Sequence, residues 1–424
     1  MRIQKKKVKL SCIKAAPRTP KGDHFMLDVA TARARILENI PFCGQETTPL
    51  TQACGRVLAQ DLPARRANPP VGVSAMDGYA ARAADTNPGA VLRVVGEAPA
   101  GHPSGQTVQT GECVRIFTGS QIPDGADTII IQENVVREGD RITLSQPGKP
   151  GQFIRARGQD FDRGDVLVRA GRRLGARDIG LAAAGGHVWL PTARRPRVGV
   201  LATGDEITLP GDPIAEDGVF NSAAFMVSAF LDQAGAEAIM LPVARDNTAS
   251  LAQSLAHARQ MDMLVTIGGA SVGTYDLVRS ALDEVGLALD FWKIAMRPGK
   301  PLLSGRLGNT PVIGLPGNPV AAFVCSVVFV VPAIQAMMGM HVSPQPQTEA
   351  AILASAVREN DERQDFLRAT LCEDPQGGLP RVTPFARQDS AQLNILAQSQ
   401  ALVLRPPHAP AQDAGTMCHM IRLG

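Results

Sequence analysis

Four short segments in the middle of the chain each offer glycine or an acidic side chain, residue types suited to binding phosphate and magnesium. Each follows a short apolar run that predicts a β-strand. The segments are 203–206 (TGDE), 245–246 (RD), 268–276 (GGASVGTYD) and 316–319 (PGNP). In an open parallel sheet, ligands bind outside the carboxyl ends of the strands. The pattern therefore predicts one crevice lined by four loops.

The side chains of this predicted crevice suit a phosphate ester or anhydride. Gly268 and Gly269 let backbone N–H groups approach an anion, and Ser271 adds a hydroxyl group. Mg²⁺ usually takes one or two carboxylates together with phosphate oxygens. The candidate carboxylates are Asp205, Glu206, Asp246 and Asp276.

Three cations in the segment 291–301 (FWKIAMRPGKP) complete the set. Lys293, Arg297 and Lys300 can neutralise phosphate or another oxyanion. Each feature alone has a plainer explanation: a Gly-Gly turn, an Asp that caps a helix, or an exposed Pro-Gly turn. Their joint occurrence at one predicted sheet edge favours a binding site.

The elements that must position these loops alternate between strand and helix from residue 197 onward. Apolar runs predict strands at 198–202, 239–243, 263–267 and 311–315. Helical patterns lie between them and after them, at 222–233, 250–259, 277–285 and 320–340. Such alternation predicts a mostly parallel sheet with helices on both faces.

The rest of the chain has a different pattern of predicted helices and strands. An amphipathic helix is expected at 25–40, and short apolar runs with Gly/Pro turns at 64–165 indicate a β-rich domain, with a helix at most near 78–84. A short helix is expected at 176–184, a strand at 188–190, and further strands at 350–353, 367–371 and 401–404. We expect a basic flexible tail (1–24), a linking α+β domain (25–63 with 164–195), a β-rich domain (64–163), an α/β domain (196–343) and a small C-terminal β domain (344–424).

Composition restricts the partners. The net charge of +3 provides no global field for DNA or membranes, and 4% aromatic residues argue against stacking on single-stranded nucleic acid. Four lysines between Arg2 and Lys14 can contact nucleic acid, but an exposed tail is the simpler interpretation.

Seven scattered cysteines predict no disulfide framework or zinc site and fit the cytoplasm. The apolar segment 320–340 is long enough to cross a bilayer, yet Ser326, Pro332 and Gln335 interrupt it, and a buried helix is expected.

The motifs as a set resemble the molybdopterin molybdenumtransferase family, known as MoeA in bacteria and as the E domain of gephyrin in animals. The resemblance covers about residues 25–405. The matching segments, in the family's order, are SAMDGYA (74–80), RIFTGS (115–120) with IPDGADTIIIQE (122–133), TGDEI (203–207), GGASVG followed by YD (268–276), RPGKP (297–301) and GLPGNP (314–319).

This resemblance implies an elongated four-domain protomer whose α/β domain is similar to the molybdopterin adenylyltransferases. It implies a homodimer in which the active cleft lies between that domain and the β-rich domain of the partner. The implied activity is that of an enzyme that inserts molybdate into adenylyl-molybdopterin and releases AMP with the help of Mg²⁺. Molybdate is a substrate of this reaction. Transient contact with a molybdopterin adenylyltransferase is also implied, whereas nucleic acid and membranes are not expected partners.

Motif matching also implies roles for individual residues. Catalytic positions would be Asp77, Thr118, Glu206, Asp276, Lys293 and Arg297. Substrate-binding positions would be Asp160 (in GQDF), Asp246, Gly268, Gly269, Ser271, Lys300, Pro316 and Pro319, and the magnesium ligands would come from Asp205, Glu206, Asp246 and Asp276. The chain departs from the family where Ala223 and Ala321 replace a common Asn and Ser, where Arg297 stands for a Lys of some members, and where 389–391 (DSA) replaces a common Gly-Ser-Gly.

Two other functions are compatible with parts of this pattern. The α/β domain alone would look alike in a molybdopterin adenylyltransferase, which consumes ATP, but the additional domains and SAMDGYA argue against that enzyme. A non-catalytic scaffold is the other alternative, since the animal relative also anchors receptors. Acidic residues after several of the strands favour an enzyme over a scaffold.

Overall fold

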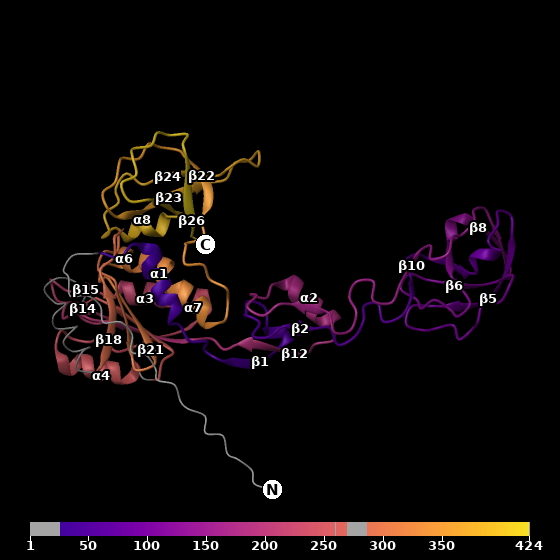
Figure 1. Ribbon diagram of the computed structural model, residues 1–424, viewed down its shortest axis with the longest axis horizontal. Helices are drawn as coiled ribbons and strands as arrows, with labels where there is room; N and C mark the ends of the chain where they lie inside the picture. The colour runs from indigo at the N-terminus through magenta and orange to yellow at the C-terminus, as the bar shows by residue number, and fades with distance from the viewer. Residues whose placement is uncertain (1–25, 259, 269–285, 424) are drawn as a thin grey trace, which may run out of the picture.

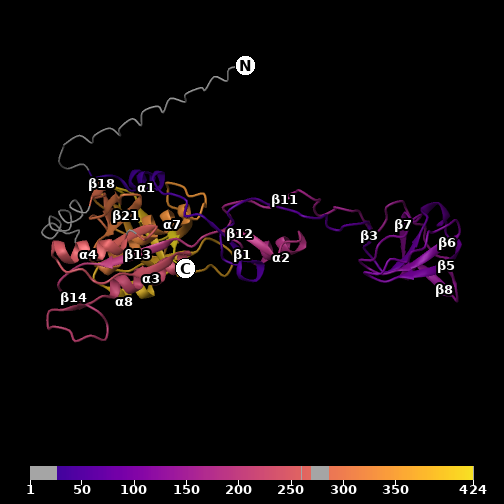
Figure 2. The same cartoon turned by 90° about the horizontal axis from the view of Figure 1, so that it is seen from below.

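The computed structural model describes residues 26–258, 260–268 and 286–423, which form an elongated molecule (Figure 1). An α/β domain and a C-terminal β domain lie together at one end, and a β-rich domain lies at the other. A narrow linking region joins the two ends, and the view from below shows the same separation (Figure 2). The multidomain α/β-plus-β architecture predicted from the sequence is thereby confirmed.

The α/β domain is built on a six-stranded sheet of order β16-β13-β17-β21-β20-β18. Its four strands on one side are parallel, and β20 and β18 join antiparallel at the other edge. The strands are β13 (Arg197–Ala202), β16 (Glu237–Met240), β17 (Met263–Ile267), β18 (Leu287–Trp292), β20 (Leu303–Leu307) and β21 (Thr310–Leu315). Strands β13 and β17 are almost wholly buried, as central parallel strands must be because helices cover both faces.

Helices α3 (Ser222–Ala234) and α4 (Thr248–Ala258) follow the first strands of this sheet. The Asn221 side chain caps α3 by accepting the amide of Ala224, and Gly235 ends the helix in the left-handed region. A short excursion after β13 carries two small strands, β14 (Ile207–Thr208) and β15 (Val219–Phe220). The predicted strands at 198–202, 263–267 and 311–315 are confirmed, and the strand predicted at 239–243 lies slightly earlier, at β16. The predicted helix at 277–285 lies outside the described residues.

The long apolar segment forms α6 (Pro319–Cys325), one π-helical segment (Ser326–Val330) and α7 (Val331–Met337). This helix is long and apolar enough to cross a membrane, but most of it is buried inside the protein. The Ser326 hydroxyl donates to the Ala322 carbonyl, which satisfies a polar group within the apolar surroundings. The segment is therefore a core helix, as expected.

The N-terminal helix α1 (Val29–Glu38) packs against this same core, although we assigned residues 25–63 to the linking domain. Val29, Ala32 and Ile36 join the α/β core cluster, and Arg33 hydrogen-bonds the carbonyl of Val328. The sequence pattern revealed the apolar face of α1 but not the surface that it covers.

The linking region consists of antiparallel strand pairs with one helix. Strand β1 (Gln45–Pro49) pairs with β12 (Trp189–Ala193), and β2 (Leu62–Pro63) pairs with β11 (Val166–Val168). Helix α2 (Ala176–Ala184) packs beside them, and the pair β3 (Val73–Ser74) and β10 (Ile154–Arg155) leads onward.

The β-rich domain holds a six-stranded sheet of order β7-β4-β6-β5-β9-β8. Its strands are β4 (Gly78–Ala81), β5 (Val91–Ala98), β6 (Glu112–Ile116), β7 (Thr128–Ile131), β8 (Val135–Glu138) and β9 (Arg141–Leu144), with short 3₁₀ turns at Ala83–Asp85 and Gln132–Asn134. A further 3₁₀ turn, Leu50–Gln52, lies in the linking region. The expectation of a helix near 78–84 is wrong, because this segment is the buried strand β4 between β6 and β7. A Cβ atom at Gly78 would lie 2.0 Å from the Ile130 carbonyl oxygen, so this strand depends on glycine.

The C-terminal domain is a closed barrel. Its five strands are β22 (Glu349–Leu353), β23 (Gln364–Cys372), β24 (Arg381–Pro384), β25 (Ala401–Arg405) and β26 (Met417–Arg422), and α8 (Leu393–Gln398) lies between β24 and β25. Strand β19 (Met296–Arg297), which comes from the α/β domain, extends this sheet by pairing in parallel with β23. Phe366 and Leu402 of the barrel belong to the α/β core cluster, so the two domains are packed together.

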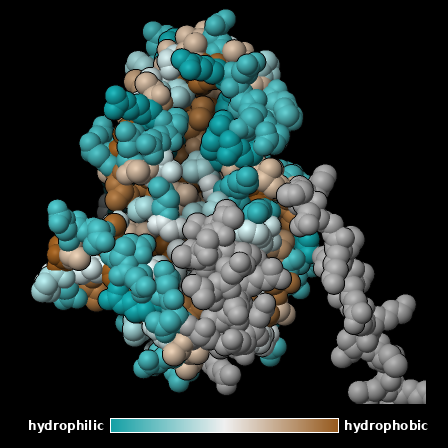
Figure 3. Space-filling view, turned by 90° about the vertical axis from the view of Figure 1, so that its left-hand side faces the viewer, coloured by the Kyte–Doolittle hydropathy of each residue, from teal (hydrophilic) through white to brown (hydrophobic). Residues whose placement is uncertain are grey.

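At the end of the molecule that holds the α/β and C-terminal domains, the exposed surface is largely hydrophilic (Figure 3). Apolar side chains gather between the upper and lower parts of this view. The six cysteines within the described ranges are free thiols, in agreement with the absence of a predicted disulfide framework.

Candidate functional site

A cavity of about 450 Å³ lies at the carboxyl ends of the parallel strands. Loops that follow β13, β16, β17 and β21 all contribute to its wall, as the predicted crevice requires. The lining residues with polar side chains or functional backbone are Thr203, Gly204, Glu206, Asn221, Ser222, Asp246, Gly268, Gly317, Asn318 and Pro319. Apolar side chains of Ile207, Val219 and Phe220 complete the wall from the β14–β15 excursion.

The cavity floor is made narrow by glycine. Gly268 has a φ of +98°, and a Cβ atom there would lie 2.6 Å from the carbonyl oxygen of Thr203. A Cβ atom at Gly317 would lie 3.3 Å from the Cα atom of Gly268, so the two loops approach backbone to backbone. The buried Thr203 hydroxyl has no hydrogen-bond partner among the residues that the structure describes. A ligand that reaches this floor meets backbone groups and an unsatisfied hydroxyl.

Three predicted acidic residues cluster at one side of the cavity. Glu206 and Asp246 line it directly, whereas Asp205 is exposed and accepts the Asp246 amide at 3.1 Å. Burial, with the charges of Asp205 and Glu206, raises the pKa of Asp246 above its ordinary value. A cation bound among these carboxylates would relieve the repulsion that raises this pKa.

The start of α6 borders the cavity opposite the carboxylates. The Asn318 side chain accepts the amides of Val320 (3.1 Å) and Ala321 (3.3 Å), which fixes the helix end beside Pro319. Pro316 precedes this turn but does not line the cavity. Ala223 lines the wall, so that position offers a methyl group where many family members carry an amide.

The three predicted cations lie in the loop 293–300 and do not line this cavity. Lys293 has a φ of +74°, and its Nζ atom lies 3.8 Å from the centre of the Trp292 ring. Arg297 forms ion pairs with Asp361 (3.2 Å) and Asp365 (2.5 Å) of the C-terminal domain. Lys300 is exposed.

The remaining predicted positions of the β-rich region lie far from the cavity within one chain (Figures 1 and 2). Asp77 accepts the amide and the hydroxyl of Thr118 beside the start of β4, and these bonds lower the pKa of Asp77. Asp160 accepts the Asn68 side chain at 3.0 Å. A single protomer therefore holds two separate halves of the predicted site.

Three predicted positions, Gly269, Ser271 and Asp276, lie outside the described residues. Conversely, the structure adds Thr203, Asn221 and Phe220 to the cavity wall. Thr203 belongs to the TGDE segment, and its place at a strand end was a usable signal. The position of Phe220 depends on the β14–β15 excursion, which no periodicity in the sequence indicated.

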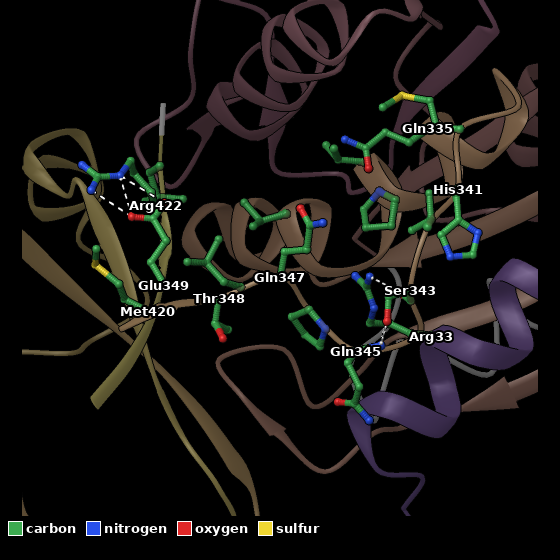
Figure 4. A pocket seen from close by; sticks show the side chains of 18 of the residues that line it. Arg33, Gln335, His341, Ser343, Gln345, Gln347, Thr348, Glu349, Met420 and Arg422 are labelled. Carbon is green, nitrogen blue, oxygen red and sulfur yellow. Dashed lines mark hydrogen bonds and ion pairs between the residues drawn. The ribbon is translucent and has the colours of Figure 1, made fainter. Parts of the chain in front are cut away.

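A larger cavity of about 780 Å³ lies between α7, the segment 340–349 and the barrel strand β26 (Figure 4). Its two arginines are already engaged. Arg33 donates to the carbonyls of Val328, Ser343 and Pro344, and Arg422 pairs with Glu349 and Glu373. Glutamine, serine and apolar side chains form most of the remaining wall, so the strand-end cavity is the better candidate for an anionic substrate.

The chain is similar to known proteins over most of its length. Three family models match in succession: "MoeA N-terminal region (domain I and II)" at 27–186, "Probable molybdopterin binding domain" at 199–336 and "MoeA C-terminal region (domain IV)" at 350–423. A molybdopterin molybdenumtransferase of Haemophilus influenzae is 37% identical over 89% of this chain and 94% of its own length. A molybdopterin molybdenumtransferase 2 of Mycobacterium tuberculosis is 35% identical over 90% and 96%.

A solved structure gives the same result at the level of the fold. The molybdopterin biosynthesis MoeA protein of Pyrococcus horikoshii superposes with a TM-score of 0.82 at 28% identity. The match covers 94% of this chain and 99% of that protein. The resemblance inferred from the motifs is therefore confirmed over nearly the whole chain.

Proposed function

Because the chain belongs to the MoeA family of molybdopterin molybdenumtransferases, we propose that it inserts molybdate into adenylyl-molybdopterin and releases AMP. The observation that carries this proposal is the strand-end cavity, which Glu206 and Asp246 line together with the close-packed glycines Gly268 and Gly317. Carboxylates beside accessible backbone amides suit a phosphate anhydride that binds together with a divalent cation.

The donor set fits Mg²⁺. No group of three or more acidic, histidine or cysteine side chains that could hold a metal occurs among the described residues. Mg²⁺ does not require such a cage, because it commonly takes one or two carboxylates and completes its shell with phosphate oxygens and water. Glu206 and Asp246 would hold it, with Asp205 nearby. When bound, Mg²⁺ supplies neutralisation of the phosphate charge.

The chain's own residues would do the positioning. The Gly268 and Gly317 backbones let the phosphates approach closely, and the Thr203 hydroxyl is available to donate a hydrogen bond. Phe220 and Val219 supply an apolar wall that can pack against an uncharged part of the substrate. Catalysis of this kind is mainly orientation and charge neutralisation, so it needs no covalent nucleophile.

The separation of the two half-sites supports a homodimer with shared clefts. Asp77 and Thr118 lie at the far end of the protomer from Glu206. We propose that the β-rich domain of the partner brings Asp77 and Thr118 to the cavity. We also propose a cytoplasmic location and transient contact with the adenylyltransferase that supplies the substrate.

The two alternative functions are less well supported. A molybdopterin adenylyltransferase would need only the α/β domain, whereas this chain also matches the flanking MoeA regions over most of its length. A purely structural scaffold would not need Asp246 in a position where burial and the neighbouring carboxylates raise its pKa.

The deciding experiment measures AMP released when the purified protein is incubated with adenylyl-molybdopterin, molybdate and Mg²⁺. We expect AMP release without ATP, and its loss in Glu206→Ala with normal thermal unfolding. Asp212→Ala is the matched control, since Asp212 is exposed on the β14–β15 excursion and does not line the cavity. Absence of AMP release from the wild-type protein, or full turnover in Glu206→Ala, would contradict the proposal.

A further inference from the structure

The loop that carries the three predicted cations is physically part of two domains. On the α/β side, the amide of Lys293 donates to the Leu302 carbonyl and that of Ile294 to the Lys300 carbonyl. On the C-terminal side, β19 pairs with β23 so that Arg297 stands opposite Asp365, and the Gln364 amide donates to the Ala295 carbonyl. The loop is therefore held from both sides by backbone hydrogen bonds.

The side chain of Arg297 reinforces the attachment to the barrel. It reaches Asp365 at 2.5 Å and Asp361 at 3.2 Å. Asp365 is 3% exposed, and its second carboxylate oxygen has no partner among the described residues. A buried carboxylate without a compensating cation is strongly unfavourable. Arg297 forms the ion pair with Asp365, and Arg405, its register partner on β25, adds a second positive charge nearby.

Asp361 is itself held in place by Arg363. The amide and guanidinium of Arg363 both donate to the Asp361 carboxylate. The guanidinium of Arg363 lowers the pKa of Asp361 to about 2. Asp361 and Asp365 thus pair with Arg297, Arg363 also pairs with Asp361, and Arg405 lies opposite Asp365 on β25, so the charge of Arg297 is compensated before any substrate arrives.

We propose that Asp365 is a positioning residue: through Arg297 it clamps the loop 293–300, which carries Lys293 and Lys300, to the C-terminal barrel. This inference rests on the proposed function, because it takes the loop to bind the phosphates of the nucleotide. It gives the C-terminal domain a role in substrate binding, although no barrel residue lines the strand-end cavity.

The direction in which Asp365→Asn changes anion affinity distinguishes this clamp from direct phosphate binding by Arg297. If Arg297 contacts the phosphate directly, Asp365 weakens that contact, and Asp365→Asn should strengthen anion binding. If Asp365 positions the loop, the same substitution should weaken binding by about tenfold. Arg297→Gln should have a similar effect, and the double variant should bind no more weakly than either single variant, since one clamp is lost in each case.

The experiment titrates AMP with Mg²⁺ into the full-length protein by calorimetry and follows hydrogen exchange of amides 293–302 by mass spectrometry. Asp365→Asn should weaken AMP binding and accelerate exchange in this loop while leaving exchange in β21 unchanged. Asp361→Asn, at a more exposed carboxylate, should produce a smaller loss in the same direction and serves if Asp365→Asn fails to fold. Glu349→Gln is the matched control, because it removes a barrel carboxylate whose partner is Arg422 rather than the loop.

Unchanged loop exchange, or AMP binding at least as tight as in the wild type, would overturn the clamp. The exchange measurement needs no ligand and therefore separates the two proposals. Faster exchange in Asp365→Asn, combined with no AMP binding by the wild-type protein, would contradict the proposed function and support the clamp.

Discussion

Asp77 accepts two hydrogen bonds from Thr118, one from its backbone nitrogen at 2.7 Å and one from its hydroxyl at 2.8 Å. The pair is preorganised at the end of the protomer opposite the strand-end cavity. It can take part in the proposed reaction only if another protomer brings it there.

The shared cleft predicts complementation between inactive variants. Asp77→Ala and Glu206→Ala should each be inactive, and a mixed dimer should regain about half of wild-type AMP release, because one cleft carries both lesions and the other carries none. Subunit exchange followed by an AMP assay measures this. Asp77→Ala mixed with Thr118→Ala is the control and should stay inactive, since each mixed cleft then keeps one lesion. Recovery in the control, or none in the test despite proven exchange, would refute the shared cleft.

Asp246 should destabilise the fold at neutral pH in return for binding the cation. Its folded pKa is raised, so the stability that it contributes is present at low pH and is lost as the pH rises through the raised value. Asp246→Asn should therefore raise the free energy of unfolding at neutral pH by less than about 1 kcal/mol, because the carboxyl group is largely solvated. The gain should vanish in acid below the ordinary aspartate range.

Urea unfolding at the two pH values, together with Mg²⁺ titration, tests this prediction. Affinity for Mg²⁺ should fall in Asp246→Asn even though the fold becomes more stable. Asp212→Asn is the control for removing an exposed carboxylate from the same region. A loss of stability in Asp246→Asn at neutral pH would show that the carboxylate repulsion is not significant.

Arg33 should be one of the main stabilising residues of α1. It is 4% exposed, it donates to three main-chain carbonyls, and burial lowers its pKa only to about 10, so it stays charged at neutral pH. Arg33→Met should lower the free energy of unfolding by about 3 kcal/mol, since it removes three hydrogen bonds, one of them to the buried Val328 carbonyl. Arg35→Met, which removes a half-exposed ion pair with Asp290, should cost at most about 1 kcal/mol. Equal losses in chemical denaturation would contradict this assignment.

Gly268 should be required for the shape of the cavity floor. Gly268→Ala combines a positive φ with a clash at 2.6 Å against Thr203, and it should abolish AMP binding. Gly211→Ala separates the two effects, because Gly211 has nearly the same φ of +99° and nothing within 4 Å of its Cβ position. That control should cost about 1–2 kcal/mol at most and leave calorimetric AMP binding intact. Normal binding in Gly268→Ala would mean that the nucleotide does not reach this floor.

Local signals in the sequence predicted the elements that surround the cavity. The bounds of β17 and of α2 follow from apolar periodicity, which acts within a few positions. The convergence of four strand ends follows from the parallel sheet, so it too was predictable.

Features that depend on distant partners were not predictable in this way. Strand β19 has two residues and exists because β23 lies beside it, about seventy positions later in the chain. Asp361 and Asp365 carry no motif that marks them as partners of Arg297. The segment at 78–84 looked compatible with a helix, and its strand conformation is imposed by β6 and β7 on either side.

The contact between α1 and the apolar core has a consequence for synthesis on the ribosome. Arg33 and its acceptor Val328 are 295 residues apart, so at about 5–20 residues per second α1 waits roughly 15–60 s for its partner. The β-rich domain is complete long before that and can fold first. Helix α1 carries only three large aliphatic side chains among alanine and arginine (VATARARILE), which limits its tendency to aggregate while its apolar face is uncovered. Helix α1, although synthesised early, is thus among the last elements of its domain to dock.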